Sequence, residues 1–340
     1  MSRPPQALWA LLTLLVGAAG CGDCGGPTEP EVVVYTSVDQ VFSQPVFRAC
    51  GQETHQRVRA VFDTEETKST GVLNRLIAEA DAPQADVFWS GDPVRPFVLM
   101  ERNLVEPYVS PVASEIPRAF RAQDGSWTGL AARARVLLVN TGHVDPDVMP
   151  TSIRDLAAPR WRAQTAIANP LFGTTTAHVA ALFSAWGDDE GRAFMDSLKQ
   201  NEVRVASSNG EVARLVVSGE VAFGLVDTDD AFEARESGAH VAIVYPDQDG
   251  MGTLVMPTSV VLMRGAPHAE AGRRLIDCLL GADVERRLAE EGGHIPLRSG
   301  VATPEGVRSA DEIRAMPVDY SQLALTMNRI EPWLRQWVGL

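Results

Sequence analysis

Apolar segments of strand length alternate with amphipathic segments of helix length along most of the chain. Strand-like segments occupy residues 32–37, 58–63, 85–90, 134–141, 163–170, 203–208, 223–228 and 255–263. Helical spacing of apolar residues occurs at 40–54, 71–79, 173–183, 190–200, from 209 onward, 273–280 and 284–291. This alternation is typical of an α/β fold with largely parallel sheets.

The chain beyond residue 31 is too long for one ordinary core and suits two lobes. By their positions, the strands at 134–141 and 255–263 are expected to cross from one lobe to the other and back. Two such connections would form a hinge. We predict a first lobe of residues 32–131 and 256–304 and a second lobe of residues 132–255 and 305–340.

The N-terminal residues predict export. Arg3 precedes an apolar run over residues 8–19, which is too short for a comfortable membrane span. The sequence VGAAGC resembles the lipobox of bacterial lipoproteins, which implies removal of residues 1–20 and a lipid anchor on Cys21. A plain cleaved signal peptide is the alternative. Residues 21–31 are rich in Gly, Pro and acid and predict a flexible tether.

Two cysteines fall within predicted helices of the folded part of the chain. Cys50 and Cys278 would meet an oxidising compartment after export, where a disulfide can form. Two buried free thiols are the alternative at this point.

Composition and motifs exclude several functions. The formal net charge of −14 argues against nucleic acid or an anionic membrane surface as partner. The chain has no HExxH, GxSxG or GxxxxGK motif, so we expect no enzyme activity.

Polar clusters stand where predicted strands end and helices begin. This edge of an open α/β sheet binds ligands, because free amides and positive helix termini point into the crevice there. The same residue types also cap helices without any ligand, and capping is the alternative at each position. Clusters in both lobes favour a shared cleft. The candidate ligand-binding residues are Ser37, Asp39, Ser90, Asp92, Gly173, Thr174, Thr175, Asn209, Asp227, Asp229 and Asp230.

The order of these motifs resembles a known family. VVVYTSVDQ, PQADVFWSGD, GTTTAHVAALF and SSNGEVARLVVSGEVAFGLVDTDDA follow one another as in the extracellular solute-binding proteins of the ferric-ion-binding type, which serve ABC importers. The resemblance covers Val32 to about Gly293. It implies an α/β, two-lobe periplasmic-binding-protein type II fold with a two-strand hinge. It also implies a periplasmic protein, expected to be a monomer, that delivers a small solute to an ABC permease in the inner membrane.

The resemblance implies a set of metal ligands, with departures from the family pattern. Members that hold ferric ion commonly use a His, a Glu and two adjacent Tyr. Asp39 stands at the place of the His, Gly91 and Asp92 at that of the Glu, and Asp229 and Asp230 at those of the Tyr pair. The implied metal ligands are thus Asp39, Asp229 and Asp230. The implied anion site comprises Gly173, Thr174, Thr175 and Asn209.

Replacing phenolates by carboxylates widens the range of expected ligands. Clustered carboxylates suit hard cations in general, so we expect iron or another hard metal cation with an accompanying anion and no resident cofactor. A small zwitterionic phosphonate, with its amine on the aspartates, is an alternative ligand. A sensory lobe that reports to a membrane receptor is an alternative role. The crowded carboxylates are expected to raise one another's pKa.

Overall fold

The computed structural model describes residues 29–63 and 71–340 of the chain. The predicted signal peptide, Cys21 and most of the predicted tether therefore lie outside the described residues. Within the described ranges, none of the helices combines the length and the apolar character that a bilayer crossing requires.

The strands and helices alternate as the hydrophobic pattern predicts. The strands are β1 (Glu31–Thr36), β2 (Arg57–Phe62), β3 (Val87–Ser90), β4 (Val105–Glu106), β5 (Thr128–Asn140), β6 (Thr165–Ala168), β7 (Arg204–Ala206), β8 (Phe223–Asp227), β9 (Val241–Val244) and β10 (Val255–Met263). The α-helices are α1 (Gln40–Thr54), α2 (Gly71–Ala78), α3 (Arg95–Glu101), α4 (Gly173–Trp186), α5 (Asp188–Gln200), α6 (Asn209–Val217), α7 (Thr228–Glu236), α8 (Ala269–Leu279), α9 (Ala282–Gly292) and α10 (Tyr320–Val338). Short 3-10 turns at Pro111–Glu115, Arg118–Phe120, Pro146–Val148, Ile153–Ala157, Pro159–Trp161 and Ala310–Glu312 complete the structure.

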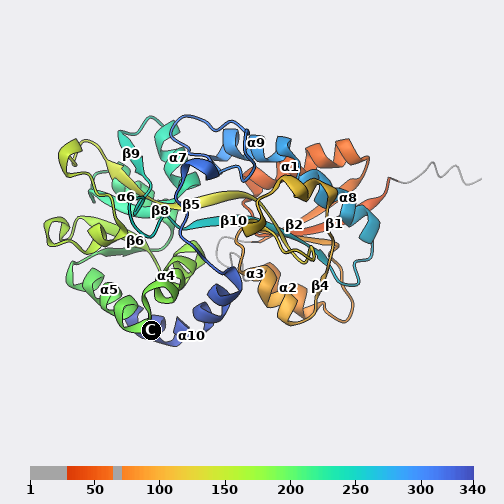
Figure 1. Ribbon diagram of the computed structural model, residues 1–340, viewed down its shortest axis with the longest axis horizontal. Helices are drawn as coiled ribbons and strands as arrows, with labels where there is room; N and C mark the ends of the chain where they lie inside the picture. Colours follow the sequence, from red (N-terminus) through yellow and green to blue (C-terminus); the bar gives the residue numbers. More distant parts are fainter. Residues whose placement is uncertain (1–28, 64–70) are drawn as a thin grey trace, which may run out of the picture.

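The strands form one continuous sheet that serves both halves of the molecule. Its order is β2-β1-β3-β10-β5-β8-β6-β7, with β4 beside β10 and β9 beside β5. We call the half around β1, β2 and β3 the first lobe and the half around β6, β7 and β8 the second lobe (Figure 1). Strands within each of these trios pair in parallel, as predicted.

The two lobes are joined by the long antiparallel strands β5 and β10. The first part of β5 pairs with β10, and its second part, from Arg135 to Val139, pairs with β8. These are the two strands predicted to cross between the lobes. The exact lobe boundaries stay a prediction.

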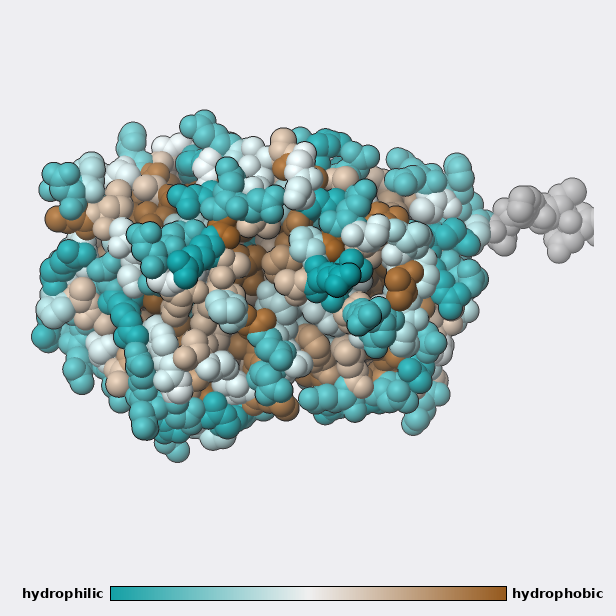
Figure 2. Space-filling view, in the orientation of Figure 1, coloured by the Kyte–Doolittle hydropathy of each residue, from teal (hydrophilic) through white to brown (hydrophobic). Residues whose placement is uncertain are grey.

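The C-terminal helix α10 was not predicted. It packs against α4 of the second lobe and also contacts α3 of the first lobe. Helix α4 is buried from Thr174 to Phe183, and α10 and α5 both pack against it. On the face shown in Figure 2, hydrophilic residues predominate, and hydrophobic residues reach the surface in the central part where the lobes meet.

A disulfide joins two helices of the first lobe. Cys50 on α1 is bonded to Cys278 on α8, across a sequence separation of 228 residues. The bridge, rather than two free thiols, is therefore the form that the structure contains. Both segments of the first lobe are covalently linked although β6, β7 and β8 of the second lobe lie between them in sequence.

Removing the disulfide should destabilise the protein. We expect Cys50→Ser with Cys278→Ser to lower the free energy of unfolding by about 2–4 kcal/mol, because the unfolded chain loses a cross-link over a long loop. Urea denaturation followed by circular dichroism measures the change. Reductant should lower the unfolding midpoint of the wild type and leave that of the double variant unchanged. An equal midpoint for both proteins under oxidising conditions would contradict the prediction.

Candidate functional site

Two arginines interrupt the apolar sequence of β5 where it passes between the lobes. Arg133 and Arg135 are two residues apart, so their side chains leave the same face of the strand. The Arg135 side chain is fully buried, and that of Arg133 is 12% exposed. Buried guanidinium groups need charged or hydrogen-bonding partners, and the ends of neighbouring elements supply them.

Arg135 has partners on three elements of the second lobe. Its Nη1 donates to Oδ1 of Asp227 at 2.7 Å, and the two residues are direct neighbours across β5 and β8. The same nitrogen donates to Oγ1 of Thr174 at 3.1 Å and to Oδ1 of Asn209 at 3.2 Å. Nη2 donates to Oγ1 of Thr175 at 3.2 Å. One side chain thus joins the end of β8 to the starts of α4 and α6.

The carboxylate of Asp227 is held in its ionised form. It accepts hydrogen bonds from Oγ1 of Thr174 at 2.7 Å and from Nδ2 of Asn209 at 3.3 Å. Burial acts to raise its pKa, but the charges of Arg135 and Arg133 outweigh burial and keep the pKa below its usual range. Asp227 ends β8, as predicted, and makes no side-chain capping hydrogen bond to α7.

The residues predicted to bind an anion come together around Arg135. Gly173 begins α4 with a φ of 59°, a conformation that favours glycine, and it is exposed. Thr174, Thr175 and Asn209 direct their polar atoms to the guanidinium. An anion arriving here would meet a site that already contains a positive charge. That it binds one stays a prediction.

Arg133 contacts both lobes. Its Nη1 lies 3.4 Å from Oδ2 of Asp229 and 3.4 Å from Oδ2 of Asp227 in the second lobe. Its Nη2 donates to the carbonyl oxygen of Gly91, in the loop between β3 and α3 of the first lobe. Burial disfavours the charge, but the surrounding carboxylates, Asp229 foremost, hold the pKa of Arg133 above its ordinary value.

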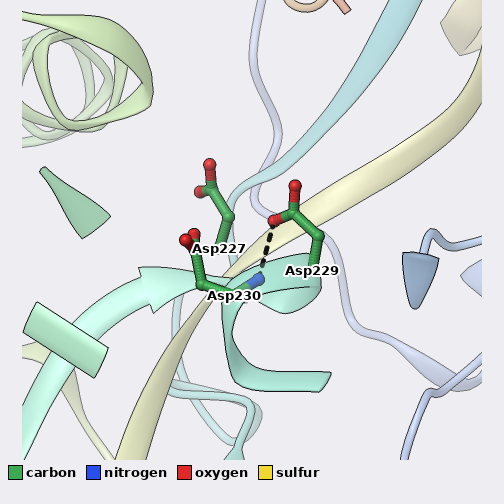
Figure 3. A group of neighbouring side chains, drawn as sticks. All are labelled: Asp227, Asp229 and Asp230. Atoms are coloured by element: carbon green, nitrogen blue, oxygen red, sulfur yellow. Dashed lines mark hydrogen bonds between the residues drawn. The ribbon is translucent and has the colours of Figure 1, made fainter. Parts of the chain in front are cut away.

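Three carboxylates converge beside these arginines. Asp227, Asp229 and Asp230 each offer an oxygen within 4.8 Å of the others. Figure 3 shows the three side chains, which come from the end of β8 and the start of α7. Asp229 and Asp230 lie in the first turn of α7, where the helix dipole favours negative charge. Oδ1 of Asp229 also accepts the backbone N–H of Asp230 at 3.1 Å. Carboxylate oxygens grouped in this way are the ligands that hard cations prefer.

Of the three carboxyl groups, that of Asp230 has the environment least favourable for ionisation. Burial raises its pKa well above the usual value, and the charges of Asp229 and Asp227 raise it further, while Arg133 and Arg135 oppose the shift. The mutual repulsion expected from the sequence is therefore present at this residue.

Three of the predicted ligand-binding residues of the first lobe, Ser37, Ser90 and Asp92, accept hydrogen bonds from backbone N–H groups of the loop after β3 and the start of α3. Oγ of Ser37 accepts the backbone N–H of Gly91 at 2.9 Å, and Oγ of Ser90 accepts that of Asp92 at 3.3 Å. Oδ1 of Asp92 accepts backbone N–H groups of residues 94 and 95 at 2.9 and 3.1 Å. These contacts fix the loop whose carbonyl group receives Arg133. Direct ligand contacts by these side chains stay a prediction.

Asp39 is a first-lobe residue whose charge acts on groups of the interlobe site. It occupies the N-cap position of α1 but makes no side-chain capping hydrogen bond. Its charge is among those that act on Arg133 and on His294. The structure therefore brings Asp39 toward the same interlobe region, as predicted.

The sequence analysis missed three residues of this site: Arg133, Arg135 and His294. Ile295 and Ala132 exchange two backbone hydrogen bonds of 2.7 Å, which places His294 opposite Arg133 in the antiparallel register. Burial lowers the pKa of His294, so its ring is neutral near pH 7. The signal available for the arginines was the pair of charges within an apolar strand, since buried charges need partners.

No tyrosine takes part in the cluster among the described residues. Each of the four hydroxyl groups is hydrogen-bonded elsewhere, in the pairs Tyr35–Glu79, Tyr108–Asp277, Tyr245–Arg308 and Tyr320–Val255. The charged groups of the site are carboxylates and guanidinium groups.

The comparisons with known proteins agree with this architecture. The family described as bacterial extracellular solute-binding protein matches residues 82–322. This chain belongs to that family. Among curated relatives of this solute-binding protein, iron uptake protein A1 of Synechocystis sp. is 26% identical over 324 residues, which cover 89% of this chain and 88% of the relative.

Solved structures show the same fold. Iron-bound HitA from Pseudomonas aeruginosa matches the solute-binding protein with a TM-score of 0.80 at 19% identity, over 92% of this chain and 100% of HitA. AfuA from Actinobacillus pleuropneumoniae, with exogenous fructose-6-phosphate bound, matches with a TM-score of 0.78 at 19% identity, over 92% and 100% of the two chains. The predicted two-lobe type II fold is thereby confirmed, and membership of the family supports the predicted periplasmic location.

Breaking the Arg135 pair should be costly. We expect Asp227→Asn to lower the free energy of unfolding by about 3–5 kcal/mol, because it leaves a buried guanidinium without its counter-charge. Urea denaturation at pH 7 measures the loss. Asp229→Asn is the matched control and should cost clearly less, since Asp229 meets Arg133 only at 3.4 Å. Equal losses for the two variants would show that Asp227 has no special structural role.

The raised pKa of Asp230 predicts a pH-dependent stability. Above about pH 4 the unfolded chain ionises this carboxyl while the folded protein resists ionisation, so Asp230 destabilises the ligand-free protein as the pH rises. Asp230→Asn should therefore unfold at a higher urea concentration than the wild type at pH 8. The difference should shrink as the pH falls toward 4. A difference that stays constant over this range would argue against the raised pKa.

Proposed function

We propose that this protein is the solute-capturing component of an ABC importer and holds a hard metal cation, with iron as the first candidate, together with a small anion between its lobes. In this proposal it is a monomer without enzyme activity, anchored to the membrane through a lipid on Cys21. An ABC permease receives the solute from it.

The cluster of Asp227, Asp229 and Asp230 is the observation that carries the cation. Three carboxylate oxygens within 4.8 Å match the ligand type and crowding of a site for a hard cation. With all groups ionised, these carboxylates outnumber the guanidinium groups of Arg133 and Arg135. A bound cation would supply the missing positive charge and relieve the repulsion at Asp230.

The two arginines support the accompanying anion. The Nε atoms of Arg133 and Arg135 are buried and have no hydrogen-bond partner within the described part of the chain. Guanidinium groups suit carboxylate and phosphate oxygens in particular. A site that contains both signs of charge fits a cation and an anion bound side by side.

The known relatives favour the same class of solute. Iron uptake protein A1 is named for iron uptake, and HitA was solved with iron bound. The absence of tyrosine from the described cluster separates this site from a phenolate site. It therefore leaves room for hard cations besides ferric ion.

Capture and release would follow from the two-lobe design. A ligand that contacts both lobes stabilises the closed form, because it binds that form more tightly than the open one. The groups available on the two sides are Asp39 and the Gly91 loop in the first lobe and the aspartate cluster in the second.

A small zwitterionic or phosphorylated solute is the second candidate. Its anionic group would pair with Arg133 and Arg135, and an amine, if present, would face the aspartates. AfuA, with fructose-6-phosphate bound, shows that the fold accepts a phosphorylated solute. The direct contacts of both arginines with carboxylates leave fewer donors for such a ligand, which makes it the second choice.

The aspartate cluster should be required for ligand binding. We expect wild-type protein, purified without chelators, to retain a metal ion by elemental analysis and native mass spectrometry. Asp229→Asn with Asp230→Asn should lose that ion and the accompanying rise in melting temperature, because two of the three carboxylate ligands are gone.

Control variants separate this loss from unfolding. Asp188→Asn with Asp189→Asn changes two acidic residues in the first turn of α5, and should leave metal retention unchanged. Retention of an organic solute without metal by the wild type would favour the zwitterion. Metal retention by the Asp229→Asn, Asp230→Asn variant at the wild-type level would reject the aspartate site.

A further inference from the structure

Arg133 occupies a position that a bound cation would be expected to fill. Its guanidinium lies between the carbonyl oxygen of Gly91 in the first lobe and the carboxylates of Asp229 and Asp227 in the second. It therefore links the two lobes directly, by a positive charge that faces the proposed metal ligands. The chain itself thus supplies a positive charge at the interlobe place where the metal ion is proposed to bind.

The two arginines are held with different strength. Arg135 meets Asp227 at 2.7 Å and is fully buried. Arg133 meets its two carboxylates only at 3.4 Å, beyond the usual length of a strong charged hydrogen bond, and keeps some exposure. Arg135 thus has the geometry of a fixed structural pair. Arg133 has that of a group that can exchange its partners.

A metal ion that used Asp229 would compete with Arg133 for the same carboxylate. The two positive charges would also lie close together in a buried place, where their repulsion is weakly screened. His294, opposite Arg133 in the register, has no negative charge in either its neutral or its protonated form and cannot offset that repulsion. An anion can offset it, because its oxygens pair with the guanidinium and with the metal at once.

We propose that Arg133 is a specificity-determining residue, which acts as the resident cation of the cleft and makes capture of a metal ion depend on an accompanying anion. This inference rests on the proposed function and states which solutes the site accepts, which we call the selection rule. A metal ion without an anion finds Asp229 paired with Arg133 and is repelled by the guanidinium. A metal ion with an oxyanion can bind Asp229, because the oxyanion then pairs with Arg133. In the absence of any solute, Arg133 ties the lobes together.

Titration calorimetry on the full-length mature protein tests the selection rule, with manganese chloride as the cation and inorganic phosphate as the anion. In wild type we expect phosphate to tighten Mn²⁺ binding by roughly tenfold or more. In Arg133→Gln we expect Mn²⁺ alone to bind roughly tenfold more tightly than it binds to wild type, with less than about a twofold further gain from phosphate. Arg133→Lys keeps the charge and should retain the dependence on phosphate.

A second measurement tests the link between the lobes without any ligand. Small-angle X-ray scattering should give ligand-free Arg133→Gln a larger radius of gyration than ligand-free wild type, since the variant lacks the contact to Gly91 and Asp229. Circular dichroism and the melting temperature establish that the variant is folded. Arg329→Gln removes an exposed arginine paired with Asp188 and serves as the matched control, with an unchanged radius.

The outcomes separate this inference from the proposed function. Equal Mn²⁺ affinity of wild type and Arg133→Gln, with equal effects of phosphate, would overturn the role of Arg133 and leave the cation site standing. Absence of Mn²⁺ binding by both proteins, with and without phosphate, would overturn the selection rule together with a general site for hard cations. Unchanged scattering in Arg133→Gln would overturn its role in tying the lobes.

Discussion

The buried ion pair between Arg135 and Asp227 is the constraint on which the rest of the site depends. Taking two charges out of water is costly, and the pair is stable here only because hydroxyl and amide groups surround it. Those groups lie in the first turns of α4 and α6. The hydrogen bonds that satisfy the Arg135 guanidinium therefore fix where both helices begin. The same pair fixes the end of β8, and therefore the direction in which α7 presents Asp229 and Asp230.

Part of this arrangement could be predicted from the sequence, because strand ends in a parallel sheet meet at one edge. That argument correctly brought Thr174, Asn209 and Asp227 together. It could not reveal their common partner, since Arg135 is remote in sequence and a strand pattern gives no register. The arginines were visible as charges within an apolar strand, a local conflict that often marks a functional or strained place. Helix α10 was missed, because the packing of a terminal helix depends on tertiary contacts that periodicity alone does not encode.

The site differs from the pattern that the family resemblance implies in the types of side chain it contains. Asp229 and Asp230 are the residues that the resemblance places at the tyrosine pair. The guanidinium of Arg133 lies against Asp229, and that of Arg135 pairs with Asp227 beside them. Adding both signs of charge to one interlobe site keeps its net charge small. It also makes the site sensitive to the charge distribution of a solute as well as to its total charge. This is a physical route by which one fold could serve metal ions in some members and phosphorylated solutes in others.

The disulfide assigns different mechanical roles to the two lobes. Strand β1 begins at Glu31, so whatever holds the N-terminus meets the molecule in the first lobe, and the bond between α1 and α8 closes that lobe into one covalent body. Strands β6, β7 and β8 of the second lobe lie in sequence between the two bonded cysteines, and the sheet connects the two lobes through β5 and β10. If the N-terminus is anchored as proposed, the first lobe would be the stationary platform, and lobe closure would move the second lobe relative to it.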